Sequence, residues 1–331
     1  MEISFEPPQI LLYFYYFIGT ISLFLNAFGI YLTIFKGIQM DTFKYYLLVF
    51  QILCMIIDFH ITFLMQPVGL FPLVAGTSNG ILSSFFDITT HWQMSITNLL
   101  ITAQTGSMAV CFIRKHQAIA QIDRKNIISR HLFFVICLSK VFWSFATFFI
   151  FLQAGMTKTE QFEYIFSNSE AMIYYENFEN LKNFAIYKVE TITEIALGMI
   201  IINGLISVIT TIWATNQMFI MLRKNRTRIS QASYLKHKSA LLSLFAQFIT
   251  SSVCIIPPVI ITITVVTKMK YSQELSHYLL AIFSSHSTIN ILVMIVTFPA
   301  YRKFCMFWRK STNIVNVSSV IVTKEIRSSY K

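Results

Sequence analysis

Seven long apolar stretches divide the chain, and short polar segments connect them. Five stretches carry no charged residue, and the other two are interrupted only by Asp58 and Lys140. A helix needs about 20 mostly apolar residues to cross the ~30 Å hydrocarbon core of a bilayer. Each stretch is long enough, so the pattern predicts seven membrane-spanning helices. Their expected positions are about 10–35, 45–67, 90–113, 132–154, 195–222, 239–267 and 275–299.

Composition supports the same fold class. Hydrophobic residues make up 55% of the chain and charged residues 12%, whereas soluble domains carry roughly 25% charge. A soluble fold with so little charge would expose apolar surface everywhere, while lipid solvates that surface. We therefore expect an all-α membrane protein, with one seven-helix domain over residues 1–310 and a disordered tail over 311–331. No inverted half-to-half symmetry of the kind common in transporters is evident.

Basic residues gather on one side of the predicted spans. Most of the 26 Lys and Arg residues fall in the first, third and fifth connecting segments and in the tail. The positive-inside rule then places the amino terminus outside and the carboxyl terminus in the cytoplasm. The net charge of +11 therefore reflects topology, and we do not expect nucleic acid as a partner.

Two of the predicted outer loops are substantial. The segment 67–89 contains Pro67, Pro72 and several glycines, which are typical of a turn-rich structure. The segment 156–194 is long, acidic and rich in aromatic residues. It is either a flexible cover over the mouth of the bundle or a solvated acidic linker.

The sixth predicted span contains the pair Pro257 and Pro258. Proline lacks the N–H of the helix ladder and clashes with the preceding turn, so we expect a kink there. The kink is either a pivot for a conformational switch or a static bend.

A short basic and aromatic segment follows the seventh span. If residues 301–310 are helical, Phe304, Phe307 and Trp308 share one face, which is the composition of a helix lying in the membrane interface among lipid headgroups. Cys305 lies where palmitoylation occurs in membrane proteins. The alternative is a simple cluster of charges that stops membrane transfer.

Asp58 and Lys140 are candidates for a polar network inside the membrane. A buried charge is costly in lipid, so Asp58 should face the bundle interior and have a partner. Lys140 either extends toward the inner face or pairs with Asp58.

Metal chemistry and catalysis are not expected. His60, His91 and His286 form none of the helical pairs typical of zinc sites. The five cysteines show no C-x-x-C pattern, and none lies in a predicted outer loop, so no disulfide framework is expected. We therefore predict no cofactor, no metal and no enzymatic activity.

Three segments resemble those of nematode serpentine chemoreceptors. The run from Pro67 to Gly76, followed by Gly80, resembles the turn after their second helix. Cys111-Phe112-Ile113-Arg114-Lys115-His116-Gln117 resembles the inner end of their third helix, and the run from His286 to Phe304 resembles the end of their seventh. The chain is most similar to serpentine receptor class I, with class H as a near relative.

This resemblance implies a G-protein-coupled chemosensory receptor for an external small molecule such as an odorant or pheromone. It would lie in the plasma membrane, including that of sensory cilia, and signal to a heterotrimeric G protein. The Asp-Arg-Tyr and Asn-Pro-x-x-Tyr motifs of rhodopsin-like receptors are absent, so their activation details do not carry over. Candidates for residues facing the G protein are Arg114, Lys115, His116, Arg223, Lys224, Arg226 and Arg228.

Two alternatives from other classes stay open. A ligand-gated channel of the insect odorant receptor kind would have the opposite orientation. A transporter or membrane hydrolase would need more intramembrane charges than Asp58 and Lys140.

Overall fold

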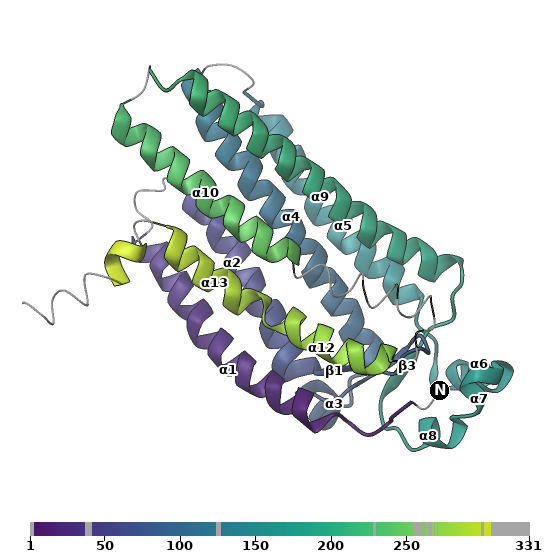
Figure 1. Cartoon of the computed structure of the whole chain (residues 1–331). Coiled ribbons are helices and arrows are strands. Elements are labelled where there is room, and N and C mark those ends of the chain that lie inside the picture. The colour runs from purple at the N-terminus through teal and green to yellow at the C-terminus, as the bar shows by residue number, and fades with distance from the viewer. Residues whose placement is uncertain are drawn as a thin grey trace, which may run out of the picture.

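The computed structural model of the chain describes residues 3–36, 42–123, 127–227, 230–253, 271–298 and 301–305, together with residues 260, 263, 267 and 269. Long helices run side by side along the molecule, and a smaller folded region covers one end (Figure 1). The long helices are α1 (Gln9–Tyr31), α2 (Phe43–Phe59), α4 (Thr90–Asp123), α5 (Arg130–Gln153), α9 (Thr191–Lys224), α10 (Gln231–Val253), and the consecutive pair α12 (Ser272–Ser284) and α13 (His286–Thr297).

Each predicted span corresponds to one of these helices or, for the seventh span, to the pair α12 and α13. Six segments of the described chain, which include every long helix except α10, are long and apolar enough to cross a membrane. The first two include π-helical ends, η1 (Leu32–Lys36) and η3 (His60–Met65). Helix α10 supplies the described part of the sixth span, while residues 254–259, which include Pro257 and Pro258, lie outside the described residues.

Two helices extend further toward the basic side than the apolar runs indicate. Helix α4 ends at Asp123, beyond the predicted end at 113, and α10 begins at Gln231, before the predicted start at 239. At 1.5 Å per residue, a helix of 34 residues such as α4 is about 50 Å long, which exceeds the hydrocarbon core. The apolar run marks the membrane crossing, whereas polar residues continue the helix beyond it.

Helix α4 occupies the centre of the bundle and contacts α2, α5, α9 and α10. In its most apolar window 56% of residues are buried, compared with 11% in α5 and 22% in α9. Helices α5 and α9 therefore lie at the periphery, with apolar faces suited to contact with lipid.

One end of the bundle carries a folded cap, defined here as residues 67–89 and 155–190. Its three antiparallel strands are β1 (Pro67–Gly69), β2 (Ala75–Ser78) and β3 (Phe184–Ile186), in the order β1-β2-β3. The register places Val68 opposite Thr77, and Gly76 opposite Ala185. The sheet thus joins two loops that are far apart in the sequence. Helices α3 (Ile81–Phe86), α6 (Lys158–Ser167), α7 (Ser169–Met172) and α8 (Tyr175–Glu179) complete the cap.

The cap has an apolar core of its own. Phe178 packs edge-to-face against Phe5 with ring centroids 5.0 Å apart, so the amino-terminal segment also belongs to this core. Thr157 and Glu160 form a capping box at the start of α6, which satisfies backbone donors that a helix leaves unpaired. The buried members of this apolar core are Ile3, Leu70, Leu73, Ala75, Ile165, Ala171, Phe178, Phe184 and Ile186. Because the segment 156–194 contributes to a packed core, the alternative of a solvated acidic linker is wrong.

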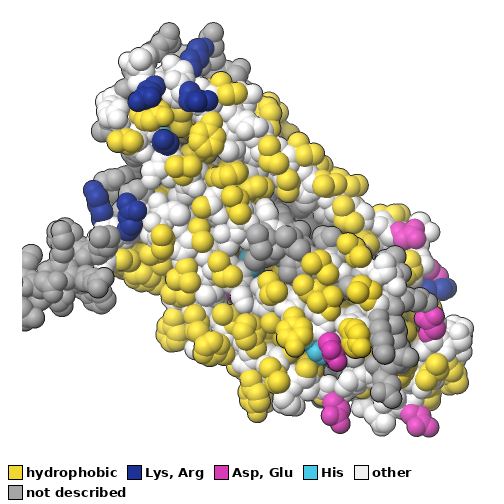
Figure 2. All heavy atoms as spheres, in the orientation of Figure 1, with side chains coloured by type: hydrophobic (Ala, Val, Ile, Leu, Met, Phe, Trp, Pro, Cys, Tyr) yellow, Lys and Arg dark blue, Asp and Glu magenta, His cyan; other side chains and the backbone are white. Residues whose placement is uncertain are grey.

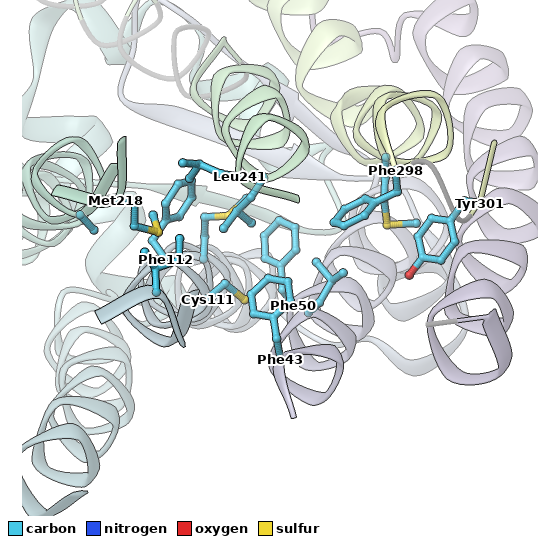
Figure 3. Close-up of a cluster of buried hydrophobic side chains, with 14 of the residues drawn as sticks. Phe43, Phe50, Cys111, Phe112, Met218, Leu241, Phe298 and Tyr301 are labelled. Atoms are coloured by element: carbon cyan, nitrogen blue, oxygen red, sulfur yellow. The ribbon is translucent and has the colours of Figure 1, made fainter. Parts of the chain in front are cut away.

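A larger apolar core fills the opposite half of the bundle (Figure 3). Phe112 of α4 packs against Phe248 of α10 at 5.7 Å between ring centroids. Met218 of α9 and Leu241 of α10 are fully buried beside it. The helices are therefore tightly packed together at this end, which we call the basic end.

Residues 301–305 are helical. Tyr301 is buried, and its hydroxyl donates to the Thr33 hydroxyl of η1 at 3.3 Å. Lys36 lies 4.5 Å from the centroid of the Phe304 ring. The segment after α13 is thus held against the end of α1. The rest of the predicted interfacial helix, 306–310, and the tail 311–331 lie outside the described residues.

Candidate functional site

A cavity of about 300 Å³ lies between the sheet of the cap and the ends of the helices. We call it the cap cavity. Helix α4 and η3, which continues α2, form its walls, and α12 closes one side. Strands β1 and β2, with Ala185 of β3 and the following Tyr187, cover it. Its apolar lining includes Ile61, Met65, Val68, Ala75, Met94, Ile101, Ala185, Leu280 and Phe283. Among the described residues, no charged side chain lines it.

Most polar groups that line the cap cavity already have partners. The Thr97 hydroxyl donates to the Gln93 carbonyl at 3.0 Å, and the Thr90 hydroxyl lies 2.8 Å from that of Ser78. Asn98 differs. Its backbone carbonyl accepts from the Thr102 hydroxyl at 2.8 Å, but its side-chain amide makes no hydrogen bond to any other described residue although it lines the cavity.

Tyr187, the residue after β3, connects the cap to the bundle. Its hydroxyl lies 3.1 Å from Nδ1 of His91, whose Nε2 lies 3.1 Å from the carbonyl oxygen of Leu152 in α5. Burial raises the pKa of the Tyr187 hydroxyl, which therefore stays protonated. His91 of α4 thus contacts both Tyr187 in the cover of the cavity and Leu152 in α5.

A polar network lies deeper in the bundle. Asp58 is 2% exposed and accepts a hydrogen bond from the Ser22 hydroxyl of α1. Its Oδ1 lies 3.5 Å from Nδ1 of His286. The other ring nitrogen of His286 lies 3.0 Å from the Gln104 amide of α4, and Asn26 donates to Ser287 at 2.9 Å. Side chains of α1, α2, α4 and α13 are therefore linked through Asp58 and His286.

Lys140 lies outside this network. Its aliphatic chain packs over Gly106 of α4, and its amino group donates to the Ser207 hydroxyl of α9 at 3.4 Å. The alternative of an Asp58–Lys140 pair is therefore wrong for this structure. Asp58 instead lies beside the ionisable side chain of His286.

Phe283 separates the cap cavity from the polar network. It lines the cap cavity and also a smaller cavity of about 60 Å³ that reaches His286, Gln104 and Ser207. Its carbonyl oxygen lies 3.0 Å from Nδ1 of His286. Phe283 lies just before the break between α12 and α13, and its ring stacks on the imidazole of His286.

The candidates at the basic end fall into two groups. Arg114 donates to the Thr42 hydroxyl at 2.6 Å. Lys115 and His116 are only 8% and 1% exposed, because they pack against Phe43 and Trp213 respectively. In contrast, Arg223, Lys224 and Arg226 are exposed where α9 ends, while Arg228 lies outside the described residues.

Charge separates the two ends of the molecule. Figure 2 shows Lys and Arg side chains at the end where α9 approaches α10, and Asp and Glu side chains around the cap. At the cap, Lys182 and Lys188 are each paired with an acid, Asp87 and Glu190, at 2.5 Å.

Histidines and cysteines have separate surroundings. Within the described ranges, no three His, Cys, Asp or Glu side chains come close enough together to hold a metal ion. Nε2 of His60 lies 3.1 Å from the Gln93 carbonyl oxygen. The four described cysteines, Cys54, Cys111, Cys137 and Cys305, are free thiols, and Cys305 is half-buried.

The sequence alone drew attention to the run from Pro67 to Gly76, part of which lines the cap cavity, but not to the other lining residues. Asn98, Tyr187 and Phe283 lie in unremarkable sequence, and their importance comes from positions that only the fold defines. The sequence places His286 in the segment that resembles the seventh helix, but it does not predict the contact with Asp58.

The fold matches that of known receptors. The crystal structure of squid rhodopsin aligns with a TM-score of 0.59 over 92% of this chain and 85% of that chain, at 12% sequence identity. That identity establishes the fold alone. It confirms the seven-transmembrane helix bundle. No curated protein matches the chain.

The family is shown by a second comparison. The family model described as serpentine type 7TM GPCR chemoreceptor Sri matches residues 1–305, which is nearly the whole chain. The resemblance to serpentine chemoreceptors is thereby confirmed. The chain belongs to the serpentine type 7TM GPCR chemoreceptor Sri family.

Proposed function

We propose that this protein is a chemosensory receptor that binds an external small molecule in the cap cavity and signals to a heterotrimeric G protein. The observation that carries the proposal is the cap cavity itself. A cavity of about 300 Å³ lies within the size range of small-molecule sites, roughly 300–1,000 Å³. It occupies one end of a receptor-type bundle and connects through Phe283 to a buried polar network.

The proposed orientation places the cap outside the cell and the basic end in the cytoplasm. The excess of Lys and Arg at the basic end supports it, because such residues concentrate on the cytoplasmic side. The receptor would then lie in the plasma membrane, including that of sensory cilia. Among serpentine receptors we propose class I, with class H as a near relative.

The basic end is the proposed surface for the G protein. Arg223, Lys224 and Arg226 project from the end of α9, where an acidic partner surface would meet them. Lys115 and His116 are buried against neighbouring side chains, so they would contact a partner only after this end rearranges. Arg114 is partly exposed beside Thr42 and stays a candidate for direct contact. Arg228 stays a candidate from the sequence.

The segment after α13 is the proposed lipid contact. Half-buried Cys305 is the candidate for acylation, next to Phe304 and the basic residues Arg302 and Lys303. A two-signal anchor of an acyl chain and basic residues is the arrangement that holds proteins stably at membranes.

The alternative of a ligand-gated channel is distinguished by orientation. An epitope tag at the amino terminus should be accessible on intact cells. Accessibility only after permeabilisation would contradict our proposal and favour the channel-type class.

Signalling is tested in cells that express the full chain together with a panel of G proteins. Calcium imaging against odorants and pheromones should give a response that depends on the G protein supplied. A response that persists without any added or endogenous G protein would favour a channel, and no response despite surface expression would count against the proposal.

A further inference from the structure

We infer that the ligand of the cap cavity is an uncharged, mostly apolar molecule with one hydrogen-bonding group, and that the side-chain amide of Asn98 binds that group. This inference rests on the proposed function, because it assumes that the cap cavity is the ligand site. It goes further by naming the chemical class of the ligand and the residue that selects it.

The lining of the cavity excludes charged ligands. No Asp, Glu, Lys, Arg or His among the described residues lines it. An ion transferred from water into such a site loses its hydration with no opposite charge to replace it, which is very unfavourable. Carboxylates and ammonium ions should therefore bind far more weakly than neutral molecules of the same skeleton.

The volume of the cavity limits ligand size. An apolar cavity of about 150 Å³ holds benzene, and the cap cavity has about 300 Å³. A ligand of roughly twelve non-hydrogen atoms fits that space. Apolar side chains such as Val68, Met94 and Leu280 would surround most of its surface.

Asn98 provides the polar contact. The hydroxyls of Thr97 and Thr90 are bonded within the protein, and that of Tyr187 lies against His91. The Asn98 amide has no such partner among the described residues and lines a cavity that is otherwise largely apolar. Asn98 is partly exposed, so its amide is accessible to a ligand in the cavity. A ligand carbonyl or hydroxyl supplies a hydrogen bond, because the amide both donates and accepts.

The test uses matched ligands and direct binding. The purified full chain in lipid nanodiscs is titrated with a linear and a monocyclic skeleton of about ten carbons, each as hydrocarbon, ketone, carboxylate and ammonium. Binding is measured by calorimetry and by ligand-induced thermal stabilisation, and empty nanodiscs correct for partition into lipid. We expect the ketone to bind about five-fold more tightly than the hydrocarbon, as one net hydrogen bond provides. The charged forms should bind at least about a hundred-fold more weakly than the ketone.

Two variants assign the preference to a residue. Asn98→Leu keeps the size of the side chain but removes the amide, and it should bind ketone and hydrocarbon equally. Thr97→Val removes a hydroxyl from the same cavity that is already bonded to Gln93, and it should keep the preference for the ketone. Thermal unfolding of each variant without ligand shows that it is folded.

Three outcomes would overturn the inference. They are a preference for the ketone that survives in folded Asn98→Leu, tight binding of a carboxylate or ammonium form, and binding of no uncharged member of either series. Because no G protein is present, these outcomes are distinct from a failure of signalling. A receptor that binds the ketone as expected but activates no G protein would contradict the proposed function alone.

Discussion

The ring of Phe283 lies nearly parallel to the imidazole ring of His286, with centroids 5.6 Å apart and planes 12° from parallel. Phe283 borders the cap cavity, and His286 lies beside Asp58 and Gln104. The two rings therefore connect a site that would hold a ligand with the polar network that joins four helices. A ligand shifts the equilibrium between two receptor conformations only if it binds them with different affinity. The stack of Phe283 on His286 is the contact where that difference in affinity would arise.

Phe283→Leu should reduce the maximal response at saturating ligand by several-fold, because leucine fills much of the volume but does not stack on His286. The concentration for half-maximal response should change less than the maximum. Tyr278→Leu, on the same helix α12 but 71% exposed, is the matched control and should leave both values unchanged. Equal losses in the two variants would show that the stack has no special role.

Asp58→Leu should destabilise the receptor by about 1–2 kcal/mol, because Ser22 and His286 lose a buried partner. Asp58→Asn keeps the shape of the side chain and an oxygen acceptor, so it should cost less. Thermal unfolding in detergent measures both. A similar unfolding midpoint for Asp58→Leu and the unchanged chain would contradict the network.

The charge exchange Asp58→Lys with Lys140→Asp should not restore the surface expression lost in each single variant. Lys140 contacts Ser207 rather than Asp58, so the double variant places each charge among the wrong partners. Surface labelling of an amino-terminal tag measures expression. Recovery in the double variant would show that the two residues pair in the membrane after all.

Tyr187→Phe should loosen the cover of the cap cavity, because the hydroxyl no longer contacts His91. A typical net hydrogen bond contributes about 1 kcal/mol, so amide exchange of β3 should rise roughly five-fold. Tyr175→Phe, whose hydroxyl has no hydrogen bond to the described residues, is the control. The same increase in both variants would mean that the contact with His91 contributes nothing.

The start of α6 should depend on pH. Hydrogen bonds from the backbone amide and hydroxyl of Thr157 lower the pKa of Glu160. Because the folded pKa is below the unfolded one, this stabilisation is complete above the ordinary glutamate pKa, about 4.3, and is lost as the pH falls through the lower folded value. Exchange of α6 amides should therefore increase at acid pH, and less so in Glu160→Gln. Identical pH profiles would contradict the capping box.

The spans were predictable because apolar runs of this length usually form membrane-spanning helices. Their ends were not, since Arg114, Lys115 and His116 continue α4 as polar helical residues. The cap sheet was missed because β1 and β2 have only three and four residues, with Gly69 and Gly76 among them, and such segments look like turns.

The partner of Asp58 was also beyond the sequence. Its need for a partner follows from the cost of a charge in lipid, but the choice between Lys140 and His286 depends on how each helix is rotated. Asn98 gives no signal of its own, because an asparagine in a span becomes notable only when the fold leaves its amide facing a cavity.

Ligand-evoked nucleotide exchange on a G protein, compared between the unchanged chain and Ala185→Phe, tests the central claim most directly. Ala185 is 2% exposed and lines the cap cavity, so a phenyl ring there would fill much of the ligand space. Val189→Phe places the same phenyl ring at a cap position that is 64% exposed. We predict that an uncharged ligand raises exchange with the unchanged chain and with Val189→Phe but not with Ala185→Phe. An equal response of all three at the cell surface, or none from the unchanged chain, would contradict the account.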